Sequence, residues 1–321
     1  MIATVTLNPA LDKSMTIPGF AAGRTNRASI GRVEPGGKGI NVAKALKQLG
    51  CPVVALGFLA ASDGRFIADA LASSGIPGDF VTVPGETRVN LKIKDPLTGV
   101  ETEINEPGFR VGPGHLKALE RRIEEMAAQC AVMVFSGSLP PGAPPDVYAG
   151  FIRIAGRHGA RTILDTNGAA LKHGIEAGPD LIKPNLAEAE EILEEGIEGE
   201  QQLVRAARRL LALGPRVVVI SMGPDGALAA SPSELWRAHP PSVKASSSTG
   251  AGDAMVAALA FAMTREMPLA DALRLAMGAA AASVATDGSG AELESIQALS
   301  AGVVLRDVSE IRNLSATDDK G

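Results

Sequence analysis

We expect this chain of 321 residues to form an α/β fold on a mostly parallel sheet. Short apolar runs rich in valine and isoleucine alternate with longer stretches in which apolar residues recur at helical spacing. This alternation is typical of β–α–β crossovers, which produce parallel sheets. Apolar residues make up 45% of the chain and aromatic ones only 3%, so the core is largely aliphatic, which favours close packing of helices on a sheet.

Six short apolar runs are the candidate buried strands. They are Ala3–Leu7, Val53–Phe58, Val132–Ser136, Thr162–Asp165, Leu181–Lys183 and Val217–Ser221. The helical stretches between and after them are Val42–Leu49, Leu116–Met126, Val147–Gly156, Leu203–Leu213 and Leu269–Val284. Ligands of a parallel sheet bind beyond the carboxyl ends of its strands, so the functional residues are expected there.

Four other segments alternate polar and apolar residues with a period of two, as strands with one wet face do. They are Ser14–Phe20, Arg27–Val33, Arg88–Ile93 and Glu101–Asn105. Because they come from distant parts of the chain, we interpret them as a small second sheet that covers one end of the main sheet. Such a sheet serves as a lid over an active site or as a dimer contact. The alternative is an ordinary edge extension.

The length suits one large domain or a domain with an appendage. We expect a single domain over residues 1–314, with lid strands drawn from about 14–35 and 87–106. Residues 315–321 are polar and small, and we expect them to form a disordered tail.

The charge balance excludes some partners. Lys plus Arg number 31 and Asp plus Glu 36, so the net charge of −5 argues against nucleic acid or an anionic membrane as a partner. Met1–Asn8 has no basic leader and Ala276–Val284 is too short to span a bilayer, so we expect a cytoplasmic protein. Cys51 and Cys130 lie in apolar runs and are expected to be buried and reduced.

The segment Ser248–Asp253 leads directly into the apolar helical pattern Met255–Ala262. Its two glycines form a tight turn whose backbone N–H groups meet the positive end of a helix dipole, an arrangement that holds a phosphoryl group. Asp253 could also take a proton from a nearby nucleophile. The alternative interpretation is an ordinary N-cap.

A second glycine-rich segment, Glu34–Ala43, opens the Val42–Leu49 helix. It is not a Walker A loop, because Gly39 follows Lys38 where that motif needs serine or threonine, and its glycine spacing does not fit a dinucleotide fingerprint. What remains is a turn that offers Lys38 and Asn41 to a sugar or a phosphate, or a purely structural turn.

Together the two glycine-rich segments resemble the two signatures of the PfkB-type carbohydrate kinases, the ribokinase family. Further segments fall in family order over nearly the whole chain: Thr4–Asp12, Ser136–Gly142, Lys183–Glu188 and Ser221–Ala227. The resemblance implies a ribokinase-like three-layer α/β sandwich with a small β-sheet lid. It also implies MgATP as the phosphoryl donor and a homodimer that forms through the lid.

The resemblance further implies a role for each matched residue. Asp253 would take the proton from the acceptor's primary hydroxyl. The turn of Gly250, Ala251 and Gly252 would supply the anion hole for the transferring γ-phosphoryl group. The acceptor-binding positions are Asp12, Gly37 and Asn41 for sugar hydroxyls, and Arg27, Lys38, Arg88 and Ser138 near the existing phosphate. A lysine and two arginines suit a phosphate dianion, since guanidinium groups bind it in a bidentate way.

On the nucleotide side, Asn185 and Glu188 match an Asn-x-x-Glu pair that influences Mg²⁺ binding, with an indirect contact to the metal. The same two residues also look like ordinary helix capping. Asp165 follows a candidate strand and could face the metal or cap the next turn, so we assign it no role. The ATP-binding positions that the resemblance implies are Lys183, Asn185, Ser221, Gly223, Gly226 and Thr249.

Thr6–Asp12 resembles the phosphosugar branch of the family, and Gly85–Ile93 with Thr102–Asn105 resembles its members that act on D-fructose 1-phosphate. The resemblance implies conversion of D-fructose 1-phosphate to fructose 1,6-bisphosphate. Tagatose 6-phosphate and fructose 6-phosphate are the alternative acceptors. A non-catalytic sugar-phosphate or nucleotide sensor is an alternative of another class, disfavoured by the two glycine-rich motifs, Asp253 and the Asn185–Glu188 pair. A nicotinamide dehydrogenase is disfavoured because no Gly-x-Gly-x-x-Gly follows the first strand. None of the four histidines lies in a motif, which favours a carboxylate base.

Overall fold

The computed structural model describes residues 1–244, 250–286 and 292–311. Its main sheet has ten strands in the order β14-β13-β12-β11-β10-β9-β8-β1-β4-β5. The pairs from β11 through β5 are parallel and the remaining pairs are antiparallel. The strands are β1 (Ile2–Thr6), β4 (Val53–Ala60), β5 (Gly78–Val83), β8 (Val132–Ser136), β9 (Arg161–Asp165), β10 (Leu181–Ile182), β11 (Val217–Ser221), β12 (Ala227–Ala230), β13 (Leu235–His239) and β14 (Val304–Asp307). The expected α/β fold with a mostly parallel sheet is confirmed.

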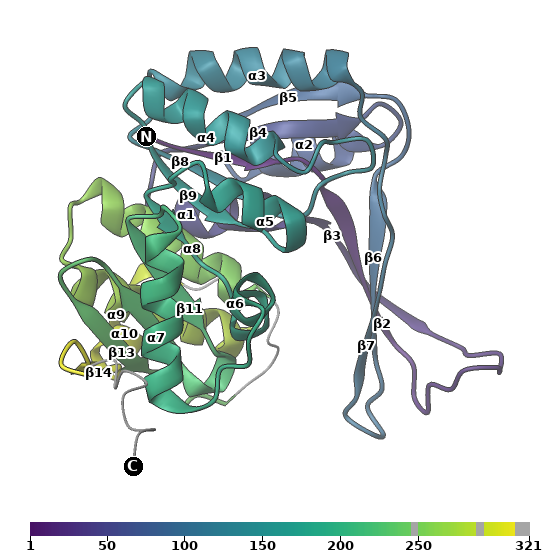
Figure 1. Ribbon diagram of the computed structural model, residues 1–321. Coiled ribbons are helices and arrows are strands. Elements are labelled where there is room, and N and C mark those ends of the chain that lie inside the picture. Colours follow the sequence, from purple (N-terminus) through teal and green to yellow (C-terminus); the bar gives the residue numbers. More distant parts are fainter. Residues whose placement is uncertain (245–249, 287–291, 312–321) are drawn as a thin grey trace.

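Helices cover both faces of this sheet and enclose two aliphatic cores, which makes the sandwich three-layered (Figure 1). One face carries α3 (Pro113–Ala127), α4 (Val147–Arg157), α5 (Gly168–Ile175), α6 (Leu186–Leu193) and α7 (Gly199–Ala212). The other carries α1 (Lys38–Gln48), α2 (Gly64–Ser73), α8 (Ala251–Thr264), α9 (Leu269–Ala285) and α10 (Leu293–Ala301). α8 is buried along most of its length, because alanines let it lie close to the sheet.

All six expected buried strands are present, whereas four strands of the main sheet were not expected. β5 lies at the edge, and the antiparallel strands β12, β13 and β14 extend the opposite side. β12 reads Ala-Leu-Ala-Ala, which has no β-branched residue and no alternation, so its sequence favours a helix as much as a strand. The short helices α2, α5 and α10 were also not expected.

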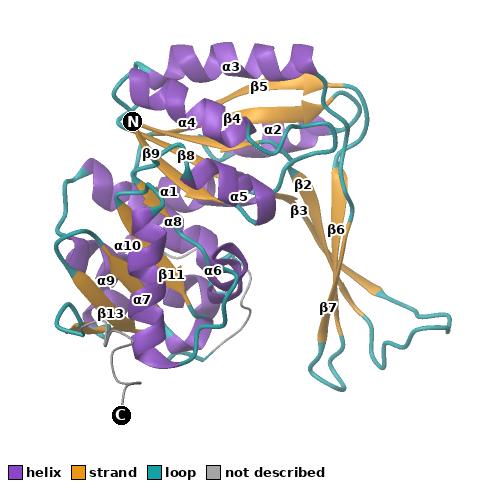
Figure 2. Cartoon of the chain, viewed as in Figure 1, coloured by secondary structure: helices purple, strands orange, loops and turns teal. Residues whose placement is uncertain are grey.

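A separate four-stranded sheet, hereafter the lid, has the order β3-β2-β6-β7. Its strands are β2 (Ala10–Thr16), β3 (Ser29–Gly36), β6 (Arg88–Lys94) and β7 (Glu101–Asn105). β2 and β6 are parallel although 71 residues separate their ends, and the other two pairs are antiparallel. Figures 1 and 2 show the lid projecting from one end of the sandwich. The expected second sheet is confirmed.

Two lid strands, β2 and β3, begin and end a few residues from the expected positions, whereas β7 has the expected bounds and β6 ends one residue later than expected. β2 starts at Ala10 rather than Ser14 and ends at Thr16, because Ile17-Pro18-Gly19 cannot continue a paired strand. The expected tail, residues 315–321, lies outside the described residues, and the expected single domain over residues 1–314 stays a prediction.

Cys51 and Cys130 are buried and free, as expected. Within the described ranges, no helix has the length and apolar character that a bilayer crossing requires. The cytoplasmic location stays a prediction.

Candidate active site

A cleft of about 1350 Å³ lies between the lid and the carboxyl ends of β1, β8 and β9. The amino ends of α1 and α8 also reach it. This is the place where parallel sheets bind ligands. The expected site residues that line the cleft are Asp12, Gly37, Lys38, Asn41, Arg88, Ser138, Gly250 and Asp253.

α8 begins on a glycine that no other residue could easily replace. Gly250 is its N-cap, with φ of 81° in the left-handed region that glycine tolerates best. The N–H groups in the first turn of a helix have no intrahelical partner, so those of Ala251 and Gly252 are available to an anion. Asp253 follows in the same turn.

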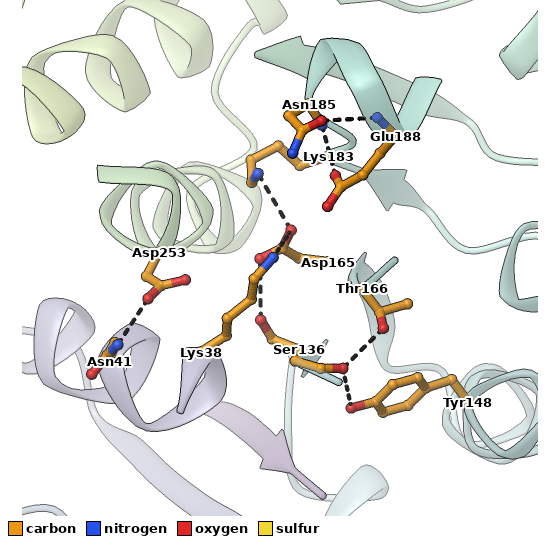
Figure 3. Close-up of polar contacts among 11 residues, drawn as sticks. Lys38, Asn41, Ser136, Tyr148, Asp165, Thr166, Lys183, Asn185, Glu188 and Asp253 are labelled. Atoms are coloured by element: carbon orange, nitrogen blue, oxygen red, sulfur yellow. Dashed lines mark hydrogen bonds and ion pairs between the residues drawn. The ribbon is translucent and has the colours of Figure 1, made fainter. Parts of the chain in front are cut away.

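Asp253 is buried, and its Oδ2 accepts a hydrogen bond of 2.9 Å from Nδ2 of Asn41 on α1 (Figure 3). Burial and, secondly, the negative charge of Asp165 raise the pKa of Asp253 to about 6. The bond from Asn41 and the charges of Lys38 and Lys183 act in the opposite direction. A carboxyl group with this pKa is deprotonated at neutral pH and still basic enough to accept a proton.

Asp165, at the end of β9, is buried between two lysines (Figure 3). Its Oδ1 lies 3.3 Å from Nζ of Lys38 and 3.3 Å from Nζ of Lys183, and its Oδ2 accepts a bond of 3.2 Å from Ser136 Oγ. Burial alone would raise the pKa of Asp165, but the two ammonium groups hold it below its usual range. Burial opposes the charge of Lys38, yet Asp165 and Asp253 keep the pKa of Lys38 above its usual value.

The two lysines lie close to the start of α8. A Cβ on Gly252 would lie 3.6 Å from Nζ of Lys183, so this ammonium group contacts the first turn of the helix. Lys38, which was expected near the acceptor's phosphate, lines the cleft with its ammonium group against Asp165. Asp165, to which the sequence assigned no role, therefore organises both cations beside Asp253.

At the lid end of the cleft, Asp12 Oδ1 accepts a bond of 2.8 Å from Nδ2 of Asn90 on β6. Burial raises the pKa of Asp12, while Asn90 and nearby cations act against this. A Cβ on Gly36 would lie 2.2 Å from the carboxyl carbon of Asp12, so only glycine allows this approach. Gly37, with φ of 108°, continues the turn into α1.

Arg88 and Ser138 both contact Asn8, and all three line the cleft. Nε of Arg88 donates to the backbone oxygen of Asn8 at 3.2 Å, and Nδ2 of Asn8 lies 3.4 Å from Ser138 Oγ. Arg27, in contrast, is an exposed residue before β3 and is not among the described residues that line the cleft.

The expected nucleotide-side residues form a turn and a cap beyond the cleft. Glu188 N donates to Asn185 Oδ1 at 2.8 Å, and Asn185 N donates to Glu188 Oε2 at 2.8 Å, so the pair forms a capping box on α6. Ser221 and Asn185 form an isolated parallel β-bridge through their backbones. Gly223 is the first residue of a short 3₁₀ helix and Gly226 is its C-cap, and both have positive φ. Thr249 lies outside the described residues.

Comparisons with known proteins agree with this geometry. Residues 5–296 match the family model described as pfkB family carbohydrate kinase. The chain belongs to the PfkB family of carbohydrate kinases. It is 41% identical to a 1-phosphofructokinase of Rhodobacter capsulatus over 86% of this chain and 87% of that protein, and 34% identical to one of Bacillus subtilis over 91% and 95%. It resembles the tetrameric inhibited form of phosphofructokinase-2 from Escherichia coli with a TM-score of 0.87, 29% identity, and coverage of 94% of this chain and 98% of that one.

Membership of this family makes the chain a phosphotransferase and implies the use of ATP. The expected family and enzyme class are confirmed, and the dehydrogenase and sensor alternatives are wrong. A PfkB kinase needs a base, an anion hole and cations around the transferring group. In this chain the start of α8 carries a buried carboxyl group, and two lysines lie against Asp165 nearby.

Sequence reasoning did not identify three polar residues of this PfkB kinase as parts of its site: Asn8, Asn90 and Asp165. Each had a usable signal. Asn8 follows the first buried strand, Asp165 ends another, and Asn90 shares one face of its strand with Arg88. The sequence indicated only weakly that Ala279, Ser283 and Ile296 also line the cleft, because these residues lie within the helices α9 and α10.

Proposed function

We propose that this kinase transfers the γ-phosphoryl group of ATP to the C6 hydroxyl of D-fructose 1-phosphate, giving fructose 1,6-bisphosphate. The observation that carries the proposal is the position of Asp253, a buried carboxyl at the start of α8 whose pKa is raised to about 6. It shares one cleft with Arg88 and Ser138, which suit an anionic group. The names of the relatives support the choice of acceptor.

In this mechanism Asp253 takes the proton of the C6 hydroxyl while the hydroxyl oxygen attacks the γ-phosphorus atom. The bond between the γ-phosphorus and the oxygen that bridges it to the β-phosphorus breaks, and ADP leaves with the electron pair of that bond. The N–H groups of Ala251 and Gly252 stabilise the charge on the transferring group, helped by the positive end of the α8 dipole. They are fixed before the reaction, so no reorganisation is needed at the moment of transfer.

We assign Lys38 and Lys183 to the phosphoryl groups on the donor side of Asp253. Asp165 holds both ammonium groups 3.3 Å from one of its oxygens, and Lys183 lies against the first turn of α8. Cations that surround the path of a phosphoryl group lower the energy of its transfer. This assignment moves Lys38 from the acceptor's phosphate, where the sequence resemblance put it, toward the donor.

Mg²⁺ fits this site as a partner of the nucleotide rather than of a protein cage. Among the described residues, no group of three or more His, Cys, Asp or Glu side chains could hold a metal ion. Asp165 is engaged by two lysines and Glu188 by the capping box. Mg²⁺ prefers phosphate oxygens, water and one or two carboxylates. Asn185 and Glu188 would therefore influence it indirectly, and the ion would neutralise phosphate charge.

The lid supports a homodimer. Its register places Val33 and the apolar side chains of β2, β6 and β7 on one face, interrupted by Lys13 and Thr102. The polar side chains, including Asp12 and Arg88, lie on the face toward the cleft. Val33 and Ile104 on the apolar face are 43% and 52% exposed in the monomer. A second copy would cover this face, as an exposed apolar patch on a regular sheet favours association.

The acceptor is tested by measuring ADP release with fructose 1-phosphate, fructose 6-phosphate and tagatose 6-phosphate under the same conditions. We expect the highest kcat/KM for fructose 1-phosphate. A clear preference for either of the other two would overturn the acceptor and leave the kinase assignment intact.

A further inference from the structure

Asn8 lies two residues after the end of β1, where the lid and the sandwich meet, and is only 5% exposed. Its Nδ2 donates to the backbone oxygen of Pro107 at 3.1 Å and lies 3.4 Å from Ser138 Oγ and 3.5 Å from the oxygen of Leu139. Its own backbone oxygen accepts from Nε of Arg88 at 3.2 Å. One residue therefore contacts three segments of the cleft wall.

The two backbone oxygens around Nδ2 determine how the Asn8 amide is oriented, because only its NH₂ group can donate to them. The Oδ1 atom is buried and has no hydrogen-bond partner among the described residues. A Cβ on Gly108 would lie 2.2 Å from this oxygen, and Gly108 has a φ of 93°. The loop between the lid and α3 thus packs against Asn8 with no space for a larger residue.

Arg88 and Ser138 come from different parts of the fold, since Arg88 begins β6 of the lid and Ser138 follows β8 of the sandwich. No hydrogen bond between their side chains occurs in the described structure, but both contact Asn8. Their relative position therefore depends on Asn8. A dianion bound by both groups requires a fixed distance between them, because hydrogen bonds weaken steeply away from their preferred geometry.

The contacts also direct the free donors of both residues. Arg88 donates from Nε to the backbone oxygen of Asn8 and from Nη1 to the backbone oxygen of Glu106. Its Nη2 has no hydrogen bond among the described residues. Ser138 Oγ receives an N–H from Asn8, so its own O–H proton is available to another acceptor. Both residues line the cleft.

We propose that Asn8 is a positioning residue that fixes the distance between Arg88 and Ser138 and thereby the preference of this kinase for phosphorylated over unphosphorylated sugars. The proposal rests on the proposed function, in which these two residues hold the existing phosphate of the acceptor. Asn8 acts through them and touches no reacting atom.

Asn8→Asp tests this role, because it keeps the size of the side chain, replaces the NH₂ donor by an acceptor and adds a negative charge beside the phosphate site. Steady-state kinetics give KM for fructose 1-phosphate and for ATP. The Ki of D-fructose as a competitive inhibitor measures binding of the sugar alone, because D-fructose has no phosphate group to contact Arg88 and Ser138. We expect KM for fructose 1-phosphate to rise about tenfold to a hundredfold, with Ki for D-fructose and KM for ATP within about threefold of wild type.

Asn8→Ser, which retains a donor, should have an intermediate effect and serves as the second variant if Asn8→Asp does not fold. Thr4→Val is the matched control, since Thr4 is a buried residue of β1 whose hydroxyl has no hydrogen-bond partner in the described structure. It should change none of the constants. An equal rise in KM for the phosphosugar and in Ki for D-fructose would overturn the proposal. If wild type prefers another phosphosugar, the same comparison with that acceptor and its unphosphorylated parent tests Asn8 separately from the proposed function.

Discussion

Asn41 and Asp253 lie 212 positions apart in the chain and are joined by a hydrogen bond of 2.9 Å across the cleft. The bond connects α1, which opens on one glycine-rich turn, with α8, which opens on the other. The amide of Asn41 favours the charged carboxylate, so it lowers a pKa that burial has raised. Through Asn41, α1 therefore lowers the pKa of Asp253, the proposed base on α8.

This relationship predicts a pH effect for Asn41→Ala. Loss of the amide removes a contact that lowers the pKa of Asp253, so this pKa should rise above its wild-type value of about 6. Asp253 must be deprotonated to act as a base, and the acidic limb of kcat/KM should therefore move to higher pH. The measurement is a pH–rate profile with saturating ATP. Arg121→Ala, at an exposed position of α3 that does not line the cleft, is the control, and a limb that moves to lower pH contradicts the relationship.

Asp165→Asn should reduce kcat by about a hundredfold, because the two lysines lose the carboxylate that holds them beside the transferring group. Two further results are expected. The acidic limb should move to lower pH, since the charge of Asp165 raises the pKa of Asp253. The free energy of unfolding should fall by about 3 kcal/mol, because buried ammonium groups lose their partner.

Ser136→Ala is the control for Asp165→Asn. It removes the hydrogen bond to Asp165 Oδ2 but leaves the charges in place, so kcat should fall by less than about tenfold. Equal losses in the two variants would show that the hydrogen bond, rather than the charge, accounts for the role of Asp165.

The lid face is tested by the double variant Val33→Glu with Ile104→Glu. Wild type should have about twice the chain mass of 32.9 kDa by light scattering after size exclusion, and the double variant should have the monomer mass. Leu97→Glu is a matched control, because Leu97 is 75% exposed in the turn after β6 and lies outside the paired strands. A double variant that keeps the wild-type mass would place the interface elsewhere.

The regular part of the fold follows from the sequence because parallel strands buried on both faces are continuous apolar runs. Val132–Ser136 and Val217–Ser221 are predicted with the bounds that the structure gives them. β12 could not be predicted, since its pairing with β11 and β13, rather than the propensity of Ala-Leu-Ala-Ala, makes it a strand. Tertiary contacts decide such short segments.

The site is predictable to the level of motifs. The glycine turns indicate Asp253, Lys38 and Asn41, because only a few residue types serve a phosphoryl group at a helix start. The partner of Lys38 is not predictable, since Asp165 lies 127 positions away and its carboxyl could equally have faced a metal. The same holds for Asn8, whose importance arises from three segments of the chain that converge on it only in the folded structure.

Asp253→Asn tests the account most directly. The amide keeps the shape of the side chain but cannot take the proton from the C6 hydroxyl, so kcat with fructose 1-phosphate and ATP should fall by about 10³–10⁴-fold. The Kd for fructose 1-phosphate, measured by calorimetry, should stay within about threefold of wild type, because the acceptor is held mainly by residues at the lid end of the cleft. Turnover within about tenfold of wild type would contradict the role of Asp253 as the base.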